Sequence, residues 1–144
     1  MNEFLVNDPT DDFLLWALAY CYAGNAEYEE AIETLKKRTL GTNTNWIYAY
    51  CYAKLGKMEE ARGILNYHLA RKKVDHVPDF MMAMQYIAVG DNKTALDYLE
   101  KSIEVRGENW FVLGFAKGPM IDPIRTEPRF RKIMATLYQK YVHK

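Results

Sequence analysis

The sequence has few of the residues from which metal and catalytic sites are usually built. Its 144 residues include two cysteines and three histidines, and no two histidines are three or four positions apart, as two ligands on one helix face would be. It contains no CxxC, HExxH, GxGxxG or GK[ST] motif. We therefore expect no bound metal, no cofactor and no catalytic site, and we predict that the protein is not an enzyme.

The sequence also lacks an excess charge and a long apolar run. Nineteen Lys and Arg residues balance nineteen Asp and Glu residues, so no overall field attracts nucleic acid or an anionic membrane. The longest apolar run, residues 13–23, is far shorter than the roughly 20 residues that cross a bilayer. The N-terminus MNEFLVNDPTDDF has neither the positive charge nor the apolar stretch of a signal peptide. We expect a cytoplasmic protein that does not bind membranes.

The two cysteines occupy the same place in two copies of one pentapeptide. AYCYA stands at residues 19–23 and again at 49–53, which places Cys21 and Cys51 in apolar surroundings. Small buried thiols in a reducing compartment fit this setting. We expect both to be buried and unbridged.

Aromatic residues are plentiful, at 14% of the chain with eleven tyrosines, and the pentapeptide shows that they recur. A shift of thirty residues places Trp16 on Trp46 and Leu35 on Leu65. A further shift of 34 residues brings Tyr52 onto Tyr86. The chain therefore contains an internal repeat in three copies.

Each copy divides into two predicted helices. The first helices, about residues 11–24, 45–55 and 78–89, are apolar almost all round, whereas the second helices are amphipathic. In copies two and three, Gly56 and Gly90 stand where the first helix should end in a residue of left-handed conformation. The first copy has Ala26 at this position. Asn25 is a candidate N-cap for the second helix of copy one.

These repeated positions resemble the tetratricopeptide repeat, a helix-turn-helix unit of about 34 residues. That motif has a small residue and then an aromatic one in its first helix, and a small residue and then a large one in its second helix. All three copies match at all four places, with Ala19, Tyr22, Ala31 and Leu35; Ala49, Tyr52, Ala61 and Leu65; and Ala83, Tyr86, Ala95 and Leu99.

The resemblance implies an all-α fold, an α-solenoid of three helix-turn-helix repeats with a C-terminal capping helix. We predict one tetratricopeptide-like domain over residues 1–144, with repeats at about 11–41, 43–73 and 77–107 and a capping segment at 108–144. The thirty-residue spacing removes about one turn from the second helix of the first copy. The stretch DPIRTEPRF resembles the segment that closes such regions at the C-terminal end of larger, mostly bacterial, regulatory proteins. We predict a helix over 127–142.

The resemblance also implies which residues face the concave groove of the array. They are Phe13, Trp16, Tyr20, Trp46, Tyr50, Phe80 and Met84. Most are aromatic, and the Lys, Arg and Asn residues that clamp a peptide carboxylate in some family members are missing. We therefore predict a protein–protein interaction scaffold whose groove receives apolar side chains from an extended or helical segment of a partner.

Three alternatives to this binding role follow from the same residues. In the first, the rings belong to the core. In the second, residues Phe4, Leu5 and Val6 fill the groove from within the chain. In the third, a second copy fills the groove, which would make the chain a homo-oligomerisation module. A fourth reading is a pentatricopeptide-like binder of single-stranded RNA, because the stretch YAKLGKMEEARGIL resembles that repeat superficially. Those arrays read bases with small polar residues where this chain has Trp and Tyr.

Overall fold

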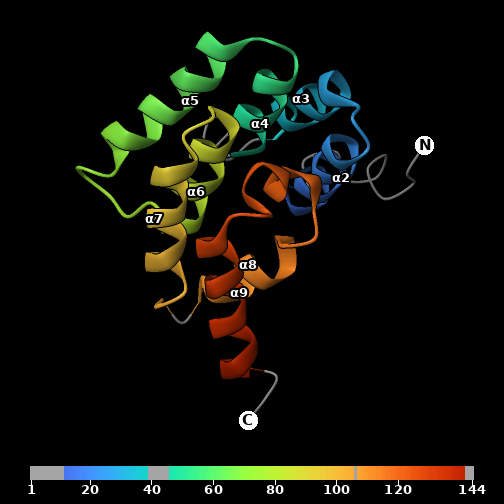
Figure 1. Cartoon of the computed structure of the whole chain (residues 1–144). Coiled ribbons are helices and arrows are strands. Elements are labelled where there is room, and N and C mark those ends of the chain that lie inside the picture. Colours follow the sequence, from blue (N-terminus) through green and yellow to red (C-terminus); the bar gives the residue numbers. More distant parts are fainter. Residues whose placement is uncertain (1–11, 39–45, 106, 142–144) are drawn as a thin grey trace.

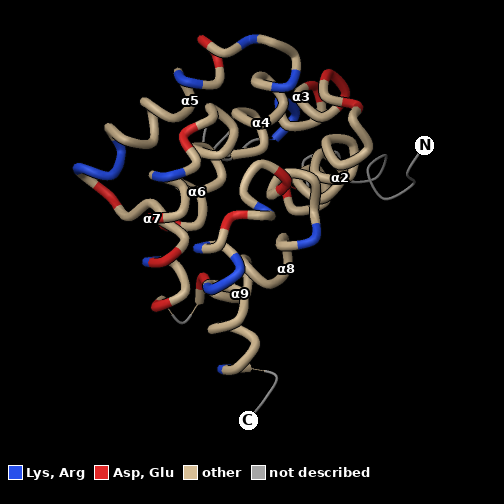
Figure 2. The backbone as a smooth tube through the Cα atoms, in the orientation of Figure 1, with Lys and Arg blue, Asp and Glu red and all other residues tan. Residues whose placement is uncertain are grey.

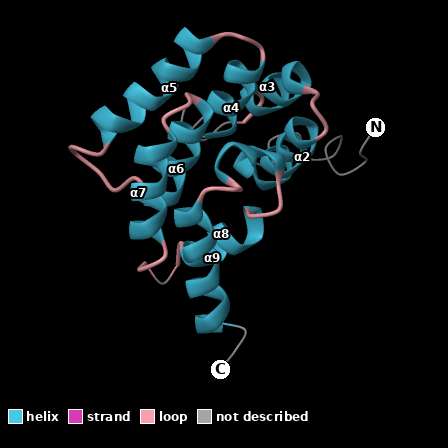
Figure 3. Cartoon of the chain, viewed as in Figure 1, coloured by secondary structure: helices cyan, strands magenta, loops and turns pink. Residues whose placement is uncertain are grey.

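The computed structural model of the chain describes residues 12–38, 46–105 and 107–141. These residues form helices joined by short turns, and no strand occurs among them (Figure 3). In chain order the helices are α2 (Asp12–Gly24), α3 (Tyr28–Lys36), α4 (Trp46–Lys54), α5 (Met58–Arg71), α6 (Asp79–Ala88), α7 (Asn92–Ser102), α8 (Asn109–Phe115), the 3₁₀-helix η1 (Pro119–Ile124) and α9 (Pro128–Tyr141). The predicted all-α class and its repeated helix pairs are confirmed. That the whole chain is a single domain stays a prediction.

The helices α2 to α7 pack as three consecutive hairpins. In these hairpins α2 packs along α3, α4 along α5 and α6 along α7, while α4 also contacts both α2 and α6. The close approach of the helices depends on alanine, because a larger side chain at the contact would hold them apart. The alanines of the repeat are all fully buried, at positions Ala19, Ala31, Ala49, Ala61, Ala83 and Ala95.

Each hairpin turns through the same backbone geometry. An N–H just beyond the first helix donates to a carbonyl five residues back, from Glu27 to Tyr22 at 2.9 Å, from Lys57 to Tyr52 at 2.8 Å and from Asp91 to Tyr86 at 2.9 Å. This closure requires a residue in the left-handed region. Gly56 (φ +78°) and Gly90 (φ +89°) fill it as predicted, and Ala26 (φ +63°) fills it in the first hairpin.

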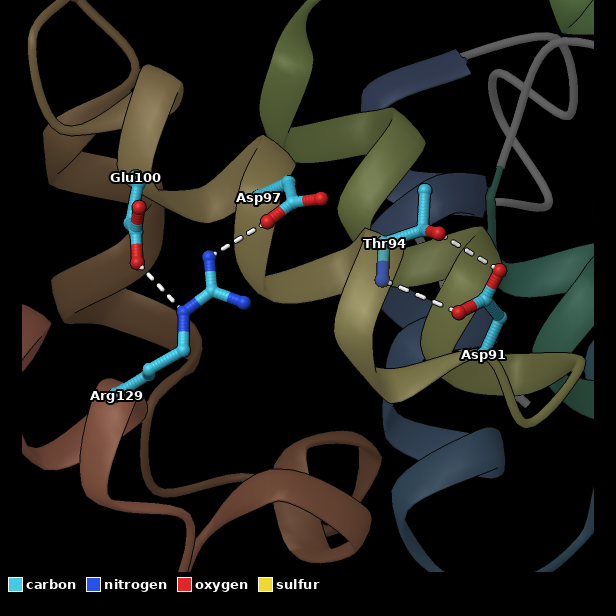
Figure 4. A network of polar contacts seen from close by, with 5 residues as sticks. All are labelled: Asp91, Thr94, Asp97, Glu100 and Arg129. Carbon is cyan, nitrogen blue, oxygen red and sulfur yellow. Dashed lines mark hydrogen bonds and ion pairs between the residues drawn. The ribbon is translucent and has the colours of Figure 1, made fainter.

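The second helices differ in length and in how they begin. Within the described residues, α3 has 9 residues, α5 has 14 and α7 has 11, so the shortening predicted for the first copy is confirmed. The predicted cap at Asn25 is wrong, because Glu27 is the N-cap of α3 and its side chain makes no capping bond. Only α7 of these three helices has a side-chain cap: Asp91 Oδ1 accepts from the Thr94 N–H at 3.1 Å (Figure 4).

The two cysteines lie in different environments. Cys51 is buried, as predicted, but Cys21 is exposed, so the prediction for Cys21 is wrong. The difference in exposure follows from where each helix lies in the array. Helix α4 lies between α2 and α6, whereas α2 contacts a described first helix on one side only. The same pentapeptide is therefore covered in α4 and partly open in α2.

The last helix, α9, packs against α7 and α8. Its apolar face buries Phe130, Ile133 and Leu137, while Tyr138 at the edge of that face is exposed. Arg129 also ties α9 to α7, because its Nε donates to Glu100 at 2.8 Å and its Nη2 to Asp97 at 2.6 Å (Figure 4). The helix predicted over 127–142 is found in the structure at Pro128–Tyr141.

A buried carboxylate joins α6, α7 and α8. Glu108 precedes α8, and its Oε1 accepts from the Phe80 N–H at 2.8 Å and from Ser102 Oγ at 3.3 Å. The first N–H groups of a helix have no partner within the helix. Glu108 therefore caps α6 from a position almost thirty residues further along the chain.

The segment from α8 to η1 turns back toward the first hairpin. In Figure 1 this orange segment lies in the middle of the molecule, beside the blue α2. Figure 2 shows that α8 carries no charged residue, unlike α5 and α7. The Arg125 guanidinium fixes the bend between α8 and η1, because it donates to the carbonyls of Ala116 and Gly118, both at 2.7 Å.

Candidate functional site

Aromatic rings from the three first helices meet on the inner face of the array. The ring centroid of Trp46 in α4 lies 6.3 Å from that of Tyr20 in α2 and 6.1 Å from that of Phe80 in α6, both edge to face. Each ring stands at a predicted groove position. The structure therefore brings rings from all three repeats into one continuous row.

The inner face is filled by the chain's own Phe115. Its ring centroid lies 5.0 Å from Tyr20, 5.4 Å from Phe80, 5.6 Å from Trp46 and 6.1 Å from Trp16. Distances and angles of this kind are typical of favourable aromatic pairs. Phe115 thus takes the place in the groove that a partner's side chain was predicted to take.

The other end of the inner face is covered by η1. Met120, Ile121 and Ile124 of η1 are buried in the same core as Tyr50 and the helix α6. Burial raises the pKa of Tyr50, and the neighbouring Tyr28 raises it further. The Tyr50 hydroxyl is therefore neutral at physiological pH and lies beneath the chain's own segment.

The seven predicted groove residues consequently fall into two groups. Phe13 is 71% exposed, and Trp16 and Tyr20 are partly buried. The other four are buried, with exposed fractions of 4% for Trp46, 6% for Tyr50, 3% for Phe80 and 2% for Met84. The expectation of an open groove along all seven needs correction, because α8 and η1 cover the inner positions. Whether the seven residues bind a partner stays a prediction.

Sequence reasoning missed the residues that fill the groove. Phe111 and Phe115 are four positions apart and so lie on one face of α8, which was the available signal. The sequence pattern places these two residues only within the predicted capping segment, residues 108–144. The alternative occupant predicted from the sequence, residues 4–6, lies outside the described residues.

The groove has an open hollow beside Phe115, and we call it the aromatic pocket. Its volume is about 260 Å³, and its lining residues are Trp16, Arg38, Trp46, Pro78, Phe80, Met81, Phe111 and Phe115. The exposed ring of Phe13 lies beside it, 6.3 Å from Trp16. Arg38 is the single charged residue among these, and its buried Nε has no hydrogen-bond partner among the residues that the structure describes. The pocket is thus apolar with one unsatisfied donor.

The described part of the chain offers no arrangement suited to metal chemistry or to crossing a membrane. No group of three or more His, Cys, Asp or Glu residues in it could hold a metal ion. None of its helices is both long enough and apolar enough to span a bilayer. The features of the site from which a function can be argued are therefore its apolar surface and Arg38.

Comparison with protein-family models gives a match in the N-terminal part of the chain. Residues 3–68 match the family model described as "Anaphase-promoting complex, cyclosome, subunit 3", whose members are built of tetratricopeptide-like repeats. No curated protein and no solved structure gave a significant match. The matched residues include the first two of the three first helices, α2 and α4, and both copies of the pentapeptide.

Proposed function

We propose that this chain, a protein of tetratricopeptide-like repeats, is a non-enzymatic scaffold that binds a segment of a partner protein at the aromatic pocket. Repeats of this kind form protein–protein interaction scaffolds. In the proposed mode the partner inserts one apolar side chain between Trp16 and Phe111, above Trp46 and Phe80. Tyr20, Tyr50 and Met84 act indirectly, by holding the covering segment in place.

The observation that supports this mode is the cluster of exposed rings around an apolar hollow. Phe111 is 50% exposed although its ring stacks on Phe80 at 5.6 Å, and Phe13 is more exposed still. Large aromatic side chains left in water around a pocket are typical of an interaction site. Aromatic anchors in such pockets contribute most of the binding energy of many interfaces.

Arg38 determines the chemistry expected of the partner. A buried guanidinium nitrogen without an acceptor is unfavourable, because it has lost its water and gained no hydrogen bond. A carboxylate beside the inserted side chain would provide that acceptor with opposite charge. We therefore expect a segment in which an aromatic or aliphatic residue stands next to Asp or Glu.

The test is selection from a library of random 15-residue peptides displayed on phage, with the whole protein as bait. Enriched peptides should carry an apolar residue beside an acidic one. Their Kd, measured by fluorescence polarisation, should rise at least about tenfold in Phe111→Ala, since truncating an anchor contact costs about 1.4 kcal/mol or more. Arg38→Gln should remove the preference for the acidic residue.

A neighbouring residue supplies the matched control. Trp110 is 63% exposed and stands next to Phe111, but its ring contacts Tyr141 at 5.3 Å and does not line the pocket. Trp110→Ala should leave the Kd unchanged. Equal loss in both variants, or enrichment of no peptide, would reject the proposed site.

Self-association is the competing occupant of the same surface. Sedimentation velocity over a concentration series distinguishes self-association from partner binding. If the protein forms a tight dimer and Phe111→Ala dissociates it, a second copy fills the pocket. A monomer at all concentrations, together with peptide binding, supports the scaffold role. Binding of single-stranded oligonucleotides at low salt would instead favour the RNA reading.

A further inference from the structure

The first residues of the chain have the chemistry expected of a partner of the aromatic pocket. That partner is expected to carry an aromatic or aliphatic residue beside Asp or Glu. Residues 1–11 read MNEFLVNDPTD, which places Glu3 directly before Phe4, Leu5 and Val6. They immediately precede the described part of the chain, which begins at Asp12. The protein therefore carries its own candidate occupant for the pocket.

The charges of this segment and of the pocket are complementary. Residues 1–11 contain Glu3, Asp8 and Asp11 and no Lys or Arg. In the pocket, the buried Nε of Arg38 has no hydrogen-bond partner among the described residues. Arg38 also takes part in none of the ion pairs found among them. A carboxylate from the segment would give the guanidinium both an acceptor and the opposite charge.

The segment is attached close to the pocket. Helix α2 begins at Asp12, and the ring of Phe13 lies 6.3 Å from that of Trp16, which lines the pocket. An extended chain covers up to about 27 Å over the eight peptide bonds from Phe4 to Asp12. This is more than twice the roughly 10–12 Å diameter of a helix with its side chains. The length of the tether therefore allows Phe4 to reach the pocket while α2 stays in place.

The pocket has room and rings for one aromatic side chain. Its volume is about 260 Å³. Phe111 in its lining is 50% exposed, and Phe13 beside it is 71% exposed. A phenyl ring placed between Trp16 and Phe111 would shield exposed aromatic surface from water and add ring pairs of the favourable kind. The Phe4 side chain meets these requirements.

We propose that residues 3–6 of the chain itself occupy the aromatic pocket when no partner is bound. Phe4 inserts between Trp16 and Phe111, and the Glu3 carboxylate accepts from Arg38. This inference rests on the proposed function, because it uses the same pocket and the same recognition chemistry. A partner must then displace a tethered competitor, whose effective concentration is on the order of 1 mM. If the free segment binds with a Kd of about 0.1 mM, the tether weakens partner binding about tenfold.

The first test needs no partner. Spectra of ¹H–¹⁵N pairs resolve the indole N–H groups of Trp16 and Trp46, which line the pocket, and of Trp110, which does not. Phe4→Ala should shift the two pocket indoles and leave that of Trp110 in place. A synthetic peptide of residues 1–11, added to this variant, should return them saturably to their wild-type positions. The same peptide with Phe4→Ala should not.

Further variants define which residues of the segment matter. Asn7→Ala changes the segment outside the Glu3–Phe4 pair and should not move the pocket indoles. Glu3→Gln in the peptide should raise its Kd about fivefold, and in an Arg38→Gln background it should have no effect. Pocket indoles that coincide in wild type and Phe4→Ala, or that shift equally in Asn7→Ala, would overturn the proposal. Positions that change on dilution would also overturn it, because the segment would then come from a second copy.

Partner binding separates this inference from the proposed function. A peptide selected from the library should bind Phe4→Ala with a Kd about tenfold lower than that of the wild-type protein. Equal Kd values in the two proteins would overturn the occupancy by residues 3–6 and leave the scaffold role intact. Saturable binding of the peptide of residues 1–11, with no library peptide enriched, would support the occupancy and reject the scaffold role.

Discussion

Ala26 adopts a backbone conformation that its two counterparts fill with glycine. Its φ of +63° brings Cβ close to the carbonyl oxygen, a strain that Gly56 and Gly90 do not have. We expect Ala26→Gly to raise the free energy of unfolding by about 1 kcal/mol. Urea denaturation monitored by circular dichroism measures the change.

The control for this substitution is Ala135, an exposed residue within α9. Glycine in a helix interior is less favourable than alanine by about 1 kcal/mol. Ala135→Gly should therefore lower the free energy of unfolding, whereas Ala26→Gly should raise it. A loss of stability in both variants would contradict the strain assigned to Ala26.

The thiols of Cys21 and Cys51 should react at very different rates. Cys21 is exposed, whereas burial raises the pKa of the Cys51 thiol to about 12 and leaves it neutral and covered. We expect a disulfide reagent such as Ellman's to react quickly with Cys21 in the folded protein. Cys51 should react only after the protein has been unfolded with denaturant. Two fast thiols in the folded protein would show that α4 is not packed as described.

The raised pKa of Cys51 also predicts how stability depends on pH. The unfolded thiol ionises near its ordinary pKa of 9.0, below the folded value of about 12. The stabilising contribution is therefore complete below about pH 9 and is lost as the pH rises toward 12. Cys51→Ala should make the alkaline loss of stability less steep.

At the scale of elements, Tyr20 of α2 lies close to Gly118, the residue before η1. A Cβ added at Gly118 would lie 2.9 Å from the Tyr20 hydroxyl oxygen. The backbone of Gly118 is extended, with φ −75°, so alanine is acceptable there on backbone grounds. We expect Gly118→Ala to lower the free energy of unfolding by about 1 kcal/mol through overpacking alone.

A second substitution isolates that cause. Tyr20→Phe removes the hydroxyl and leaves the ring, so Gly118→Ala should cost much less in the Tyr20→Phe background. A double-mutant cycle of unfolding free energies gives the coupling. Additive effects would mean that η1 does not lie against α2 in solution.

The helices that recur in the repeats could be predicted from the sequence more fully than the segment from α8 to η1, which occurs once. The six helices of the hairpins follow from alanines and tyrosines that recur at matching places, and Gly56 and Gly90 fixed where two of them end. The path of α8 and η1 could not be found in this way, because no other copy of the segment exists for comparison. It is set by the fit of Phe115 among four rings and by the Arg125 bend, which depend on shape. The exposure of Cys21 likewise depends on its place in the array.

At the scale of the whole molecule, one core extends from α2 to α9. It includes Ala19 and Trp46 as well as Ile124 and Leu137, so the hairpins and the covering segment should unfold together. We expect Phe115→Ala to lower the free energy of unfolding by about 3 kcal/mol. Tryptophan fluorescence and far-ultraviolet circular dichroism should give coincident transitions in both proteins.

Separate transitions would contradict this view of the molecule. Trp16 and Trp46 both contact the Phe115 ring, so their fluorescence reports the face that α8 covers. If Phe115→Ala lowered only the transition seen by fluorescence, the covering segment would be an independent unit. Coincidence in the wild-type protein and in the variant supports a single core.

The contact between Tyr20 and Gly118 also bears on how the protein is made. A stack of helical hairpins can assemble neighbour by neighbour as it leaves the ribosome. Here Tyr20 of α2 meets Gly118 only after nearly a hundred further residues have been synthesised. Until α8 emerges, the newborn chain displays a stripe of indole and phenol rings that the finished molecule largely conceals, and for that interval it is a ready target for chaperones.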